Sequence, residues 1–159
     1  MRTVDIETTI RAPAGEVFDW LTDATNYQRV PVVRRVILVR PGDCAAHGEG
    51  AVRVVVTPLL RLTEQILEYR PPMLMRYRIV ESVPPLRHRD GFIACTQVPR
   101  GTRVRWRTEY EIASPVLSRM FTALYAPIIA GGFRVVLHTA ARELGPPRRR
   151  APIRSADLV

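Results

Sequence analysis

Residues 116–144 read VLSRMFTALYAPIIAGGFRVVLHTAAREL, and their apolar side chains recur at helical spacing. Leu117, Phe121 and Leu124 begin this series, which continues to the end of the segment. Proline is well tolerated in the first turn of a helix, where its missing N–H group needs no partner. Because Pro115 directly precedes the segment, we predict one long helix over residues 115–144.

Three residues that disfavour a helix lie inside this segment, namely Pro127, Gly131 and Gly132. Proline removes a helical hydrogen bond, and glycine loosens the backbone. We therefore expect these residues to kink or split the helix. The alternative is that the two glycines only allow the helix to pack closely on its neighbours.

The chain before this helix reads as short strands with one helical insert. The insert covers residues 13–28, where Pro13 starts a first short helix and Asp23 caps a second one. Val17, Phe18 and Leu21, together with Trp20, supply the side of the insert that is expected to be buried. The predicted strands cover residues 3–11, 32–40, 51–57, 60–69, 73–83, 87–98 and 103–112.

The last of these strands has the clearest alternation in the chain. Its apolar or aromatic positions are Val104, Trp106, Thr108, Tyr110 and Ile112, and the residues between them are Arg103, Arg105, Arg107, Glu109 and Glu111. Such a pattern is typical of an antiparallel sheet with one covered and one wet face. We expect the first set to point toward the long helix and the second toward solvent or a partner.

This order of elements predicts an α+β fold, in which a seven-stranded curved antiparallel sheet wraps around a long C-terminal helix, with two short helices after strand one. We expect residues 1–145 to form a single ligand-binding domain and residues 146–159 to form a basic, disordered tail. Deletion of residues 149–159 is expected to leave the melting temperature nearly unchanged, because this segment has few apolar groups.

Composition fits a folded globular protein. The chain has 159 residues, 47% of them hydrophobic and 25% charged, which is enough for one domain with a core. Two cysteines, Cys44 and Cys95, are too few for a disulfide framework, and no signal peptide is recognisable, so we expect a cytoplasmic protein. The uncharged stretch 120–133 is too short to span a bilayer. The net charge is +9, and because the chain contains no lysine, Schiff-base chemistry on a lysine is excluded.

Three motifs carry a resemblance to a known superfamily. Residues 10–21 read IRAPAGEVFDWL, residues 68–72 read EYRPP before a strand with Tyr77, and residues 101–106 read GTRVRW. In this order the motifs resemble the helix-grip (SRPBCC, START-like) superfamily, which includes START lipid-transfer domains, birch-pollen-allergen-like proteins and polyketide cyclases. The resemblance covers residues 3–144 and implies a ligand cavity between sheet and helix. It does not specify a reaction, because members of one fold handle unrelated ligands.

The candidate ligand-binding residues are aromatic, apolar or polar side chains on faces expected to be inward. They are Tyr77, Glu81, Arg89, Ile93, Trp106, Thr108, Tyr110, Tyr125 and Phe133. Glu81 and Arg89 lie on consecutive strands and can approach each other, either at a wet rim or around a polar ligand. Tyr77, Trp106 and Tyr110 read first as ordinary core side chains, and as cavity residues they would offer an apolar wall with a hydroxyl or indole N–H group. The catalytic residues are unknown.

Motifs of several enzyme classes are missing from the sequence. It contains no G-x-S-x-G elbow, no P-loop and no dinucleotide-binding glycine motif. The histidines, at positions 47, 88 and 138, are isolated and read as structural or surface residues. His47 with Glu49 gives only two metal ligands, which do not make a site. We therefore expect no cofactor and no metal.

Three functions remain open. The first is binding or carriage of a hydrophobic or amphipathic small molecule, such as a lipid or a polyketide-like compound, that enters near Pro127 and Gly131-Gly132. The second is a polyketide cyclase or aromatase, for which Tyr77, Arg89 and Tyr110 are the residue types able to stabilise an enolate. The third, ranked last, is binding of nucleic acid or an anionic surface by the arginines. Contact with a membrane surface and formation of a homodimer also remain open.

Overall fold

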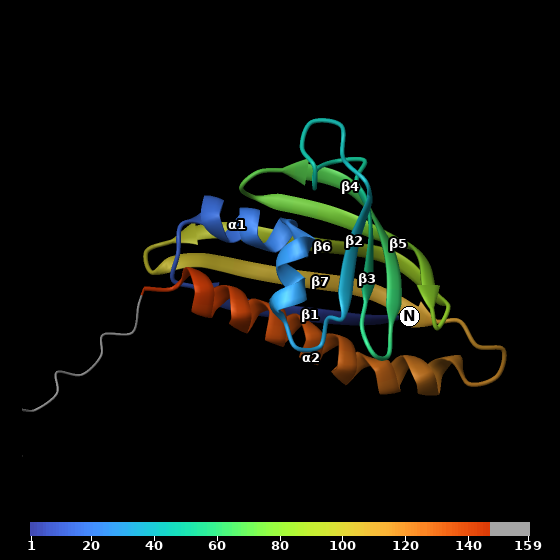
Figure 1. The fold of residues 1–159 in the computed structure, drawn as a ribbon. Helices are drawn as coiled ribbons and strands as arrows, with labels where there is room; N and C mark the ends of the chain where they lie inside the picture. Colours follow the sequence, from blue (N-terminus) through green and yellow to red (C-terminus); the bar gives the residue numbers. More distant parts are fainter. Residues whose placement is uncertain (147–159) are drawn as a thin grey trace, which may run out of the picture.

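A seven-stranded antiparallel sheet and one long helix form the framework of the protein (Figure 1). The computed structural model of the chain describes residues 1–146. The elements are β1 (Arg2–Ile10), α1 (Ala14–Thr22), the 3₁₀ helix η1 (Ala24–Arg29), β2 (Arg35–Arg40), β3 (Val52–Val56), β4 (Arg61–Arg70), β5 (Leu74–Val83), β6 (Leu86–Val98), β7 (Gly101–Ile112) and α2 (Ser118–Leu144). The predicted fold class and element order are confirmed. The predicted tail, apart from Pro146, and the proposed deletion of 149–159 lie outside the described residues.

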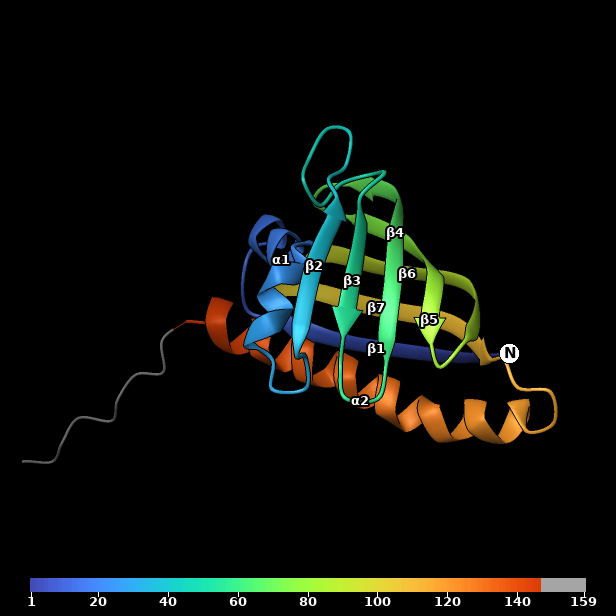
Figure 2. The same cartoon turned by 45° about the vertical axis from the view of Figure 1, so that its right-hand side comes forward.

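The strand order across the sheet is β1-β7-β6-β5-β4-β3-β2. The first strand therefore pairs with the last one, and β1 and β2 are the two edge strands. The sheet is strongly curved, and in Figure 2 β2, β3 and β4 cross in front of β6, β7 and β1. Helix α2 runs along the open side of this curve, next to β1 and β7. Helices α1 and η1 cover one end of the same concave face (Figures 1 and 2).

The alternation predicted for the last strand is confirmed in β7. Val104, Trp106, Thr108, Tyr110 and Ile112 are all buried, whereas the charged residues between them are exposed or half-buried. Ile6 of β1 lies opposite Trp106, which places apolar side chains of both strands on the inner face. One covered face and one wet face follow directly from the period of two.

The short helices lie where the sequence predicted them. The side chain of Asp23 accepts a hydrogen bond from the backbone N–H of Thr25 at 3.0 Å and so caps η1. Trp20 of α1 donates its indole N–H to Glu143 near the end of α2 at 2.8 Å. This contact ties the insert to the far end of the long helix.

Helix α2 is continuous from Ser118 to Leu144, with Pro127 inside it. Of the expected kink or split at Pro127 and the two glycines, the split was therefore wrong, and the kink stays a prediction. The inner face of α2 packs on the sheet through Ala126, Val136 and other buried residues. Burial of this face stabilises the helix more than its local propensity does, so a single proline does not end it.

The outer face of α2 is apolar and exposed over its first half. Val116 and Leu117, just before the helix, and Met120 and Leu124 within it are the residues concerned. By length and composition, α2 is the one helix among residues 1–146 that is apolar enough to cross a membrane. The uncharged stretch 120–133, on which the sequence prediction rested, is shorter than a membrane span because Arg119 and Arg134 bound it. The helix itself includes both arginines and is 27 residues long. The cytoplasmic location and the membrane-surface contact stay predictions.

Candidate functional site

A cavity of about 240 Å³ lies between the concave face of the sheet and α2. Its walls come from η1 and the residues after it, from β3, β4 and the turn between them, from β7, and from the middle of α2. The lining residues are Tyr27, Val32, Val33, Val55, Thr57, Pro58, Leu59, Leu60, Leu62, Glu64, Trp106, Ile128, Ile129, Gly132, Phe133 and Val136. The cavity lies between the two elements where the sequence placed it.

Aromatic rings form the deep wall of the cavity. The ring of Trp106 on β7 stacks on that of Phe133 on α2, with centroids 4.1 Å apart and an interplanar angle of 11°. Tyr27 of η1 lies against the same indole, with a centroid distance of 6.0 Å. Rings of this size offer apolar area for stacking against a ligand.

The exposed lining residues mark the side on which the cavity opens. Leu59, in the turn between β3 and β4, is 55% exposed, and Val32 and Ile128 are also exposed. Gly132 lines the cavity on α2, and a Cβ atom added there would meet no atom within 4 Å. The same holds for Gly131. The two glycines are therefore not required for close packing of α2.

A buried ion pair borders the cavity. Arg53 on β3 donates from Nε to Oε2 of Glu64 on β4 at 2.9 Å, and from Nη1 to the carbonyl of Thr22 at 2.8 Å. Arg53 is almost completely buried, with 2% of its side chain exposed, and its guanidinium lies 5.9 Å from the centroid of the Tyr27 ring. An arginine is always charged in a protein, so this buried cation needs Glu64 as its counter-charge.

The side-chain donors on the cavity wall are all engaged by the protein. The hydroxyl of Tyr27 donates to the carbonyl of Leu21. The hydroxyl of Thr57 donates to the carbonyl of Leu60 at 3.1 Å. The indole N–H of Trp106 donates to the hydroxyl oxygen of Tyr77 at 3.0 Å.

Behind Trp106 lies a second polar group of residues, which does not line the cavity. The backbone N–H of Ile79 donates to Nδ1 of His88, which leaves the proton of the neutral ring on Nε2. Nε2 lies 2.9 Å from the hydroxyl of Thr108 and so donates to it. The His88 ring also stacks on Tyr77, with centroids 5.6 Å apart.

Burial shifts the titration of these groups toward their neutral forms. Desolvation lowers the pKa of His88, and it raises the pKa of both Tyr27 and Tyr77. Burial likewise raises the pKa of the Cys95 thiol to about 12. At neutral pH these side chains therefore act as neutral hydrogen-bonding groups rather than as charged acids or bases.

The predicted site residues occupy four different places. Trp106 and Phe133 line the cavity. Tyr77, Ile93 and Thr108 are buried on the same face of the sheet, outside the cavity wall. Tyr110 and Tyr125 belong to a separate cluster at the other end of α2, where the hydroxyl of Tyr110 donates to the carbonyl of Thr122 at 3.2 Å. Whether any of them contacts a ligand stays a prediction.

Glu81 and Arg89 lie away from the cavity, and the predicted inward placement of Arg89 was wrong. The pairing of β6 with β7 shifts register between His88 and Asp90. This irregularity reverses the alternation, so His88 faces inward and Arg89 faces outward, where it pairs with Glu109 at 3.3 Å. Glu81 is exposed, and Arg89, which the sequence allowed to approach Glu81, pairs with Glu109 instead.

Sequence reasoning missed Arg53, Glu64 and His88. The sequence did offer a signal for Arg53 and Glu64. Arg53 is the one charged residue in a strand that is otherwise all valine, and Glu64, of opposite charge, lies on the next strand. The register places the two residues directly opposite each other. For His88 no signal was available, because the irregularity in β6 leaves no mark in the apolar pattern.

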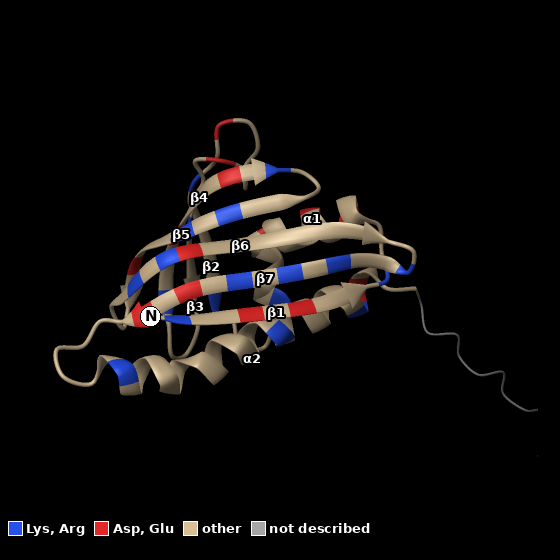
Figure 3. Ribbon diagram, turned by 180° about the vertical axis from the view of Figure 1, so that it is seen from behind, with Lys and Arg blue, Asp and Glu red and all other residues tan. Residues whose placement is uncertain are grey.

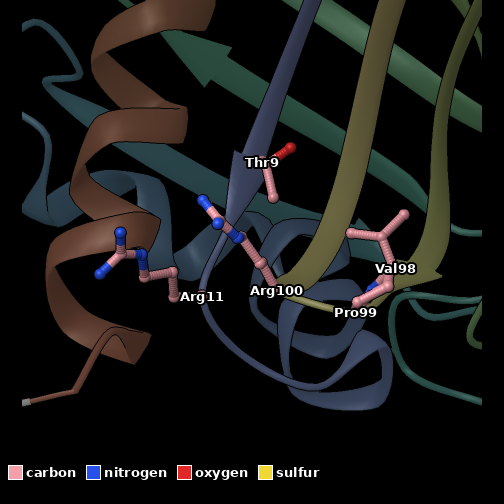
Figure 4. A pocket seen from close by; sticks show the side chains of 5 residues that line it. All are labelled: Thr9, Arg11, Val98, Pro99 and Arg100. Carbon is pink, nitrogen blue, oxygen red and sulfur yellow. The ribbon is translucent and has the colours of Figure 1, made fainter.

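Two further features of the described residues lie outside the cavity. A hollow beside the β6–β7 turn is lined by Thr9, Arg11, Val98, Pro99 and Arg100, and it shares no residue with the cavity (Figure 4). Among residues 1–146, no group of three or more histidine, cysteine or acidic side chains is placed to hold a metal ion. His47 contacts Asp23 at 3.1 Å rather than Glu49.

The family model for polyketide cyclase/dehydrase and lipid transport proteins matches residues 1–145. The chain belongs to this family. The resemblance to the helix-grip superfamily is thereby confirmed. No curated protein sequence matches the chain.

Solved structures of several proteins have the same fold. The protein TTHA0849 from Thermus thermophilus is 18% identical, with a TM-score of 0.72 over 90% of this chain and 97% of that one. A START superfamily protein from Mycobacterium smegmatis is 10% identical, with a TM-score of 0.70 over 89% and 98%. The Zhui aromatase/cyclase from Streptomyces sp. R1128 is 19% identical, with a TM-score of 0.69 over 89% and 94%. At these identities the likeness shows the fold alone.

Proposed function

We propose that this protein binds a small, largely apolar molecule in the cavity between its sheet and α2, and that it acts as a binding or carrier protein rather than an enzyme. The observation that carries the proposal is the cavity itself, with its stacked Trp106 and Phe133 and its opening beside Leu59. Ligand pockets typically measure about 300–1,000 Å³. A cavity of about 240 Å³ therefore fits a compact ligand, such as one with two fused rings, better than a long lipid chain.

The cyclase or aromatase alternative requires free hydrogen-bond donors in the cavity. Stabilising an enolate requires a hydrogen-bond donor aimed at the developing oxyanion. The side-chain donors on the wall, on Tyr27, Thr57 and Trp106, are all engaged by protein acceptors. Arg89, the cationic candidate, lies on the outer face of the sheet. Binding without turnover is the reading that these contacts support.

Two glycine variants on α2 test the proposal with a matched control. Gly132 lines the cavity, whereas its neighbour Gly131 does not, and a Cβ atom added at either position meets no atom within 4 Å. Both Gly132→Leu and Gly131→Leu are expected to raise helix stability by about 0.5–1 kcal/mol. In calorimetric titrations with 2-methoxynaphthalene, we expect Gly131→Leu to bind like the wild type and Gly132→Leu to bind at least about tenfold more weakly.

The proposal fails if the wild type does not bind the probe at any soluble concentration. It also fails if the two variants bind equally well, because the ligand would then lie elsewhere. Native mass spectrometry of freshly purified protein supplies a second readout, in which a co-purified small molecule is expected to be retained by Gly131→Leu and lost from Gly132→Leu.

A further inference from the structure

Among the polar side-chain atoms of the cavity-lining residues, one takes part in no hydrogen bond within the described residues, and this atom is an acceptor. Oε2 of Glu64 accepts the hydrogen bond from Arg53, but Oε1 has no hydrogen-bond partner among residues 1–146. Glu64 lines the cavity, with 11% of its side chain exposed. Because Glu64 lines the cavity, Oε1 is open to a donor from a bound molecule, and a ligand that covers it without supplying a donor pays the cost of its desolvation.

In contrast to this free acceptor, the side-chain donors on the wall all have acceptors within the protein. The O–H groups of Tyr27 and Thr57 and the N–H group of Trp106 all donate to the protein. Arg53 does not line the cavity, and its guanidinium is directed at Glu64 and at the carbonyl of Thr22. The wall therefore offers a ligand a free acceptor and no free side-chain donor.

We infer that the ligand is a neutral, largely apolar molecule with a hydroxyl group that donates to Oε1 of Glu64, and that the cavity rejects carboxylates such as fatty acids. The inference rests on the proposed binding function and adds the chemical class of the ligand. A carboxylate ligand brings a second negative charge next to Glu64 and finds no side-chain donor on the wall. Its desolvation is then uncompensated.

Three naphthalene derivatives of similar size test the inference in the wild-type protein at pH 7. They are 2-naphthol, which donates, 2-methoxynaphthalene, which does not, and 2-naphthoate, which is charged. A hydrogen bond to a charged acceptor strengthens binding by about tenfold or more. By calorimetric titration, we expect 2-naphthol to bind at least about tenfold more tightly than 2-methoxynaphthalene, and 2-naphthoate to bind most weakly.

A double variant assigns the preference to the ion pair. Arg53→Met combined with Glu64→Leu replaces the buried pair with apolar side chains, a change that proteins commonly tolerate. In this variant we expect 2-naphthol and 2-methoxynaphthalene to bind within about threefold of each other. If circular dichroism shows that the double variant is unfolded, Arg53→Gln combined with Glu64→Gln replaces it, because this pair leaves no charge buried alone. The preference for 2-naphthol should then fall by about threefold or more because the acceptor is neutral.

Three results would overturn the inference while leaving the proposed function intact. They are equal wild-type affinity for 2-naphthol and 2-methoxynaphthalene, binding of 2-naphthoate as tight as that of 2-naphthol, and an unchanged preference in the folded variant. Failure of the wild type to bind any of the three compounds would overturn both proposals together.

Discussion

Gly91 is the residue at which local preference and tertiary packing disagree most clearly. Gly91 lies opposite Tyr77 in the β5–β6 ladder, and the phenol ring of Tyr77 lies directly over it. A Cβ atom added at Gly91 would lie 2.5 Å from Cζ of Tyr77, closer than two carbon atoms can approach. The absence of a side chain at Gly91 is therefore what allows Tyr77 to lie flat against the sheet and reach Trp106.

We predict that Gly91→Ala lowers the free energy of unfolding by about 1–3 kcal/mol, the usual cost of overpacking a core. Within a strand, glycine to alanine is otherwise favourable by about 0.5–1 kcal/mol, so the sign itself is diagnostic. Gly15→Ala in α1 is the control, because a Cβ there meets no atom within 4 Å, and it should stabilise the protein. Urea denaturation measures both. Stabilisation by Gly91→Ala would show that Tyr77 does not occupy this place.

The second prediction at this scale concerns His88 and pH. Burial lowers the pKa of His88 in the folded protein below the ordinary value of about 6.5. Between these two values the unfolded chain binds a proton at this site and the folded chain does not, so stability rises with pH in this window. The contribution of neutral His88 to the free energy of unfolding is complete above about pH 7, and it is lost as the pH falls through the folded-state pKa.

We therefore expect His88→Gln to flatten the rise of the unfolding free energy between about pH 5 and pH 7, by up to about 1.4 kcal/mol per pH unit. His138→Gln is the control, because His138 lies exposed on α2. Denaturant unfolding at several pH values gives both slopes. If the His88→Gln slope equals that of the wild type and of His138→Gln, this histidine does not stay neutral in the folded protein.

At the scale of elements, regular patterns were predictable and local irregularities were not. The alternation in β7 identified its inner face, because a period of two admits only one assignment. The same reasoning carried into β6 placed Arg89 inside, because the register shift between His88 and Asp90 depends on pairing with β7 rather than on β6 alone. A single irregular position therefore places the half-buried His88 on the inner face, where the sequence predicted Arg89 as a polar ligand contact.

The long helix shows the opposite failure, in which a strong local signal is overridden. Pro127 predicted a kink or a split, and the split does not occur, because α2 is one helix of 27 residues that contains Pro127. Its buried face, including Ala126 and Val136, packs on the sheet, and tertiary packing of this kind outweighs the propensity of a single residue. The polar part of the site was out of reach for a related reason. Arg53 and Glu64 can be recognised as a buried ion pair beside the cavity only when the β3–β4 register, which places them opposite each other, is known.

At the scale of the whole molecule, the net charge of +9 does not collect into one uncompensated basic face on the sheet. Figure 3 shows blue and red segments side by side on β1, β6 and β7. The cross-strand pairs on this outer face are Arg105–Asp5, Arg103–Glu7, Arg89–Glu109 and Arg76–Asp90. The Arg105 guanidinium lowers the pKa of Asp5, which keeps that carboxylate charged. Exposed pairs of this kind add little stability, but they neutralise the surface locally.

This charge arrangement leads to the last prediction, that the protein is not a specific nucleic-acid binder. Nucleic-acid binding requires a contiguous basic surface that releases counterions from the phosphates, and cross-strand carboxylates on the outer face of the sheet oppose this. At physiological salt, we expect the full chain to bind a short labelled DNA duplex no more tightly than about 10⁻⁶ M, the upper range of non-specific binding. Fluorescence anisotropy over a series of salt concentrations is the measurement. Affinity in the nanomolar range, falling steeply with salt, would contradict the prediction and assign the arginines a partner of their own.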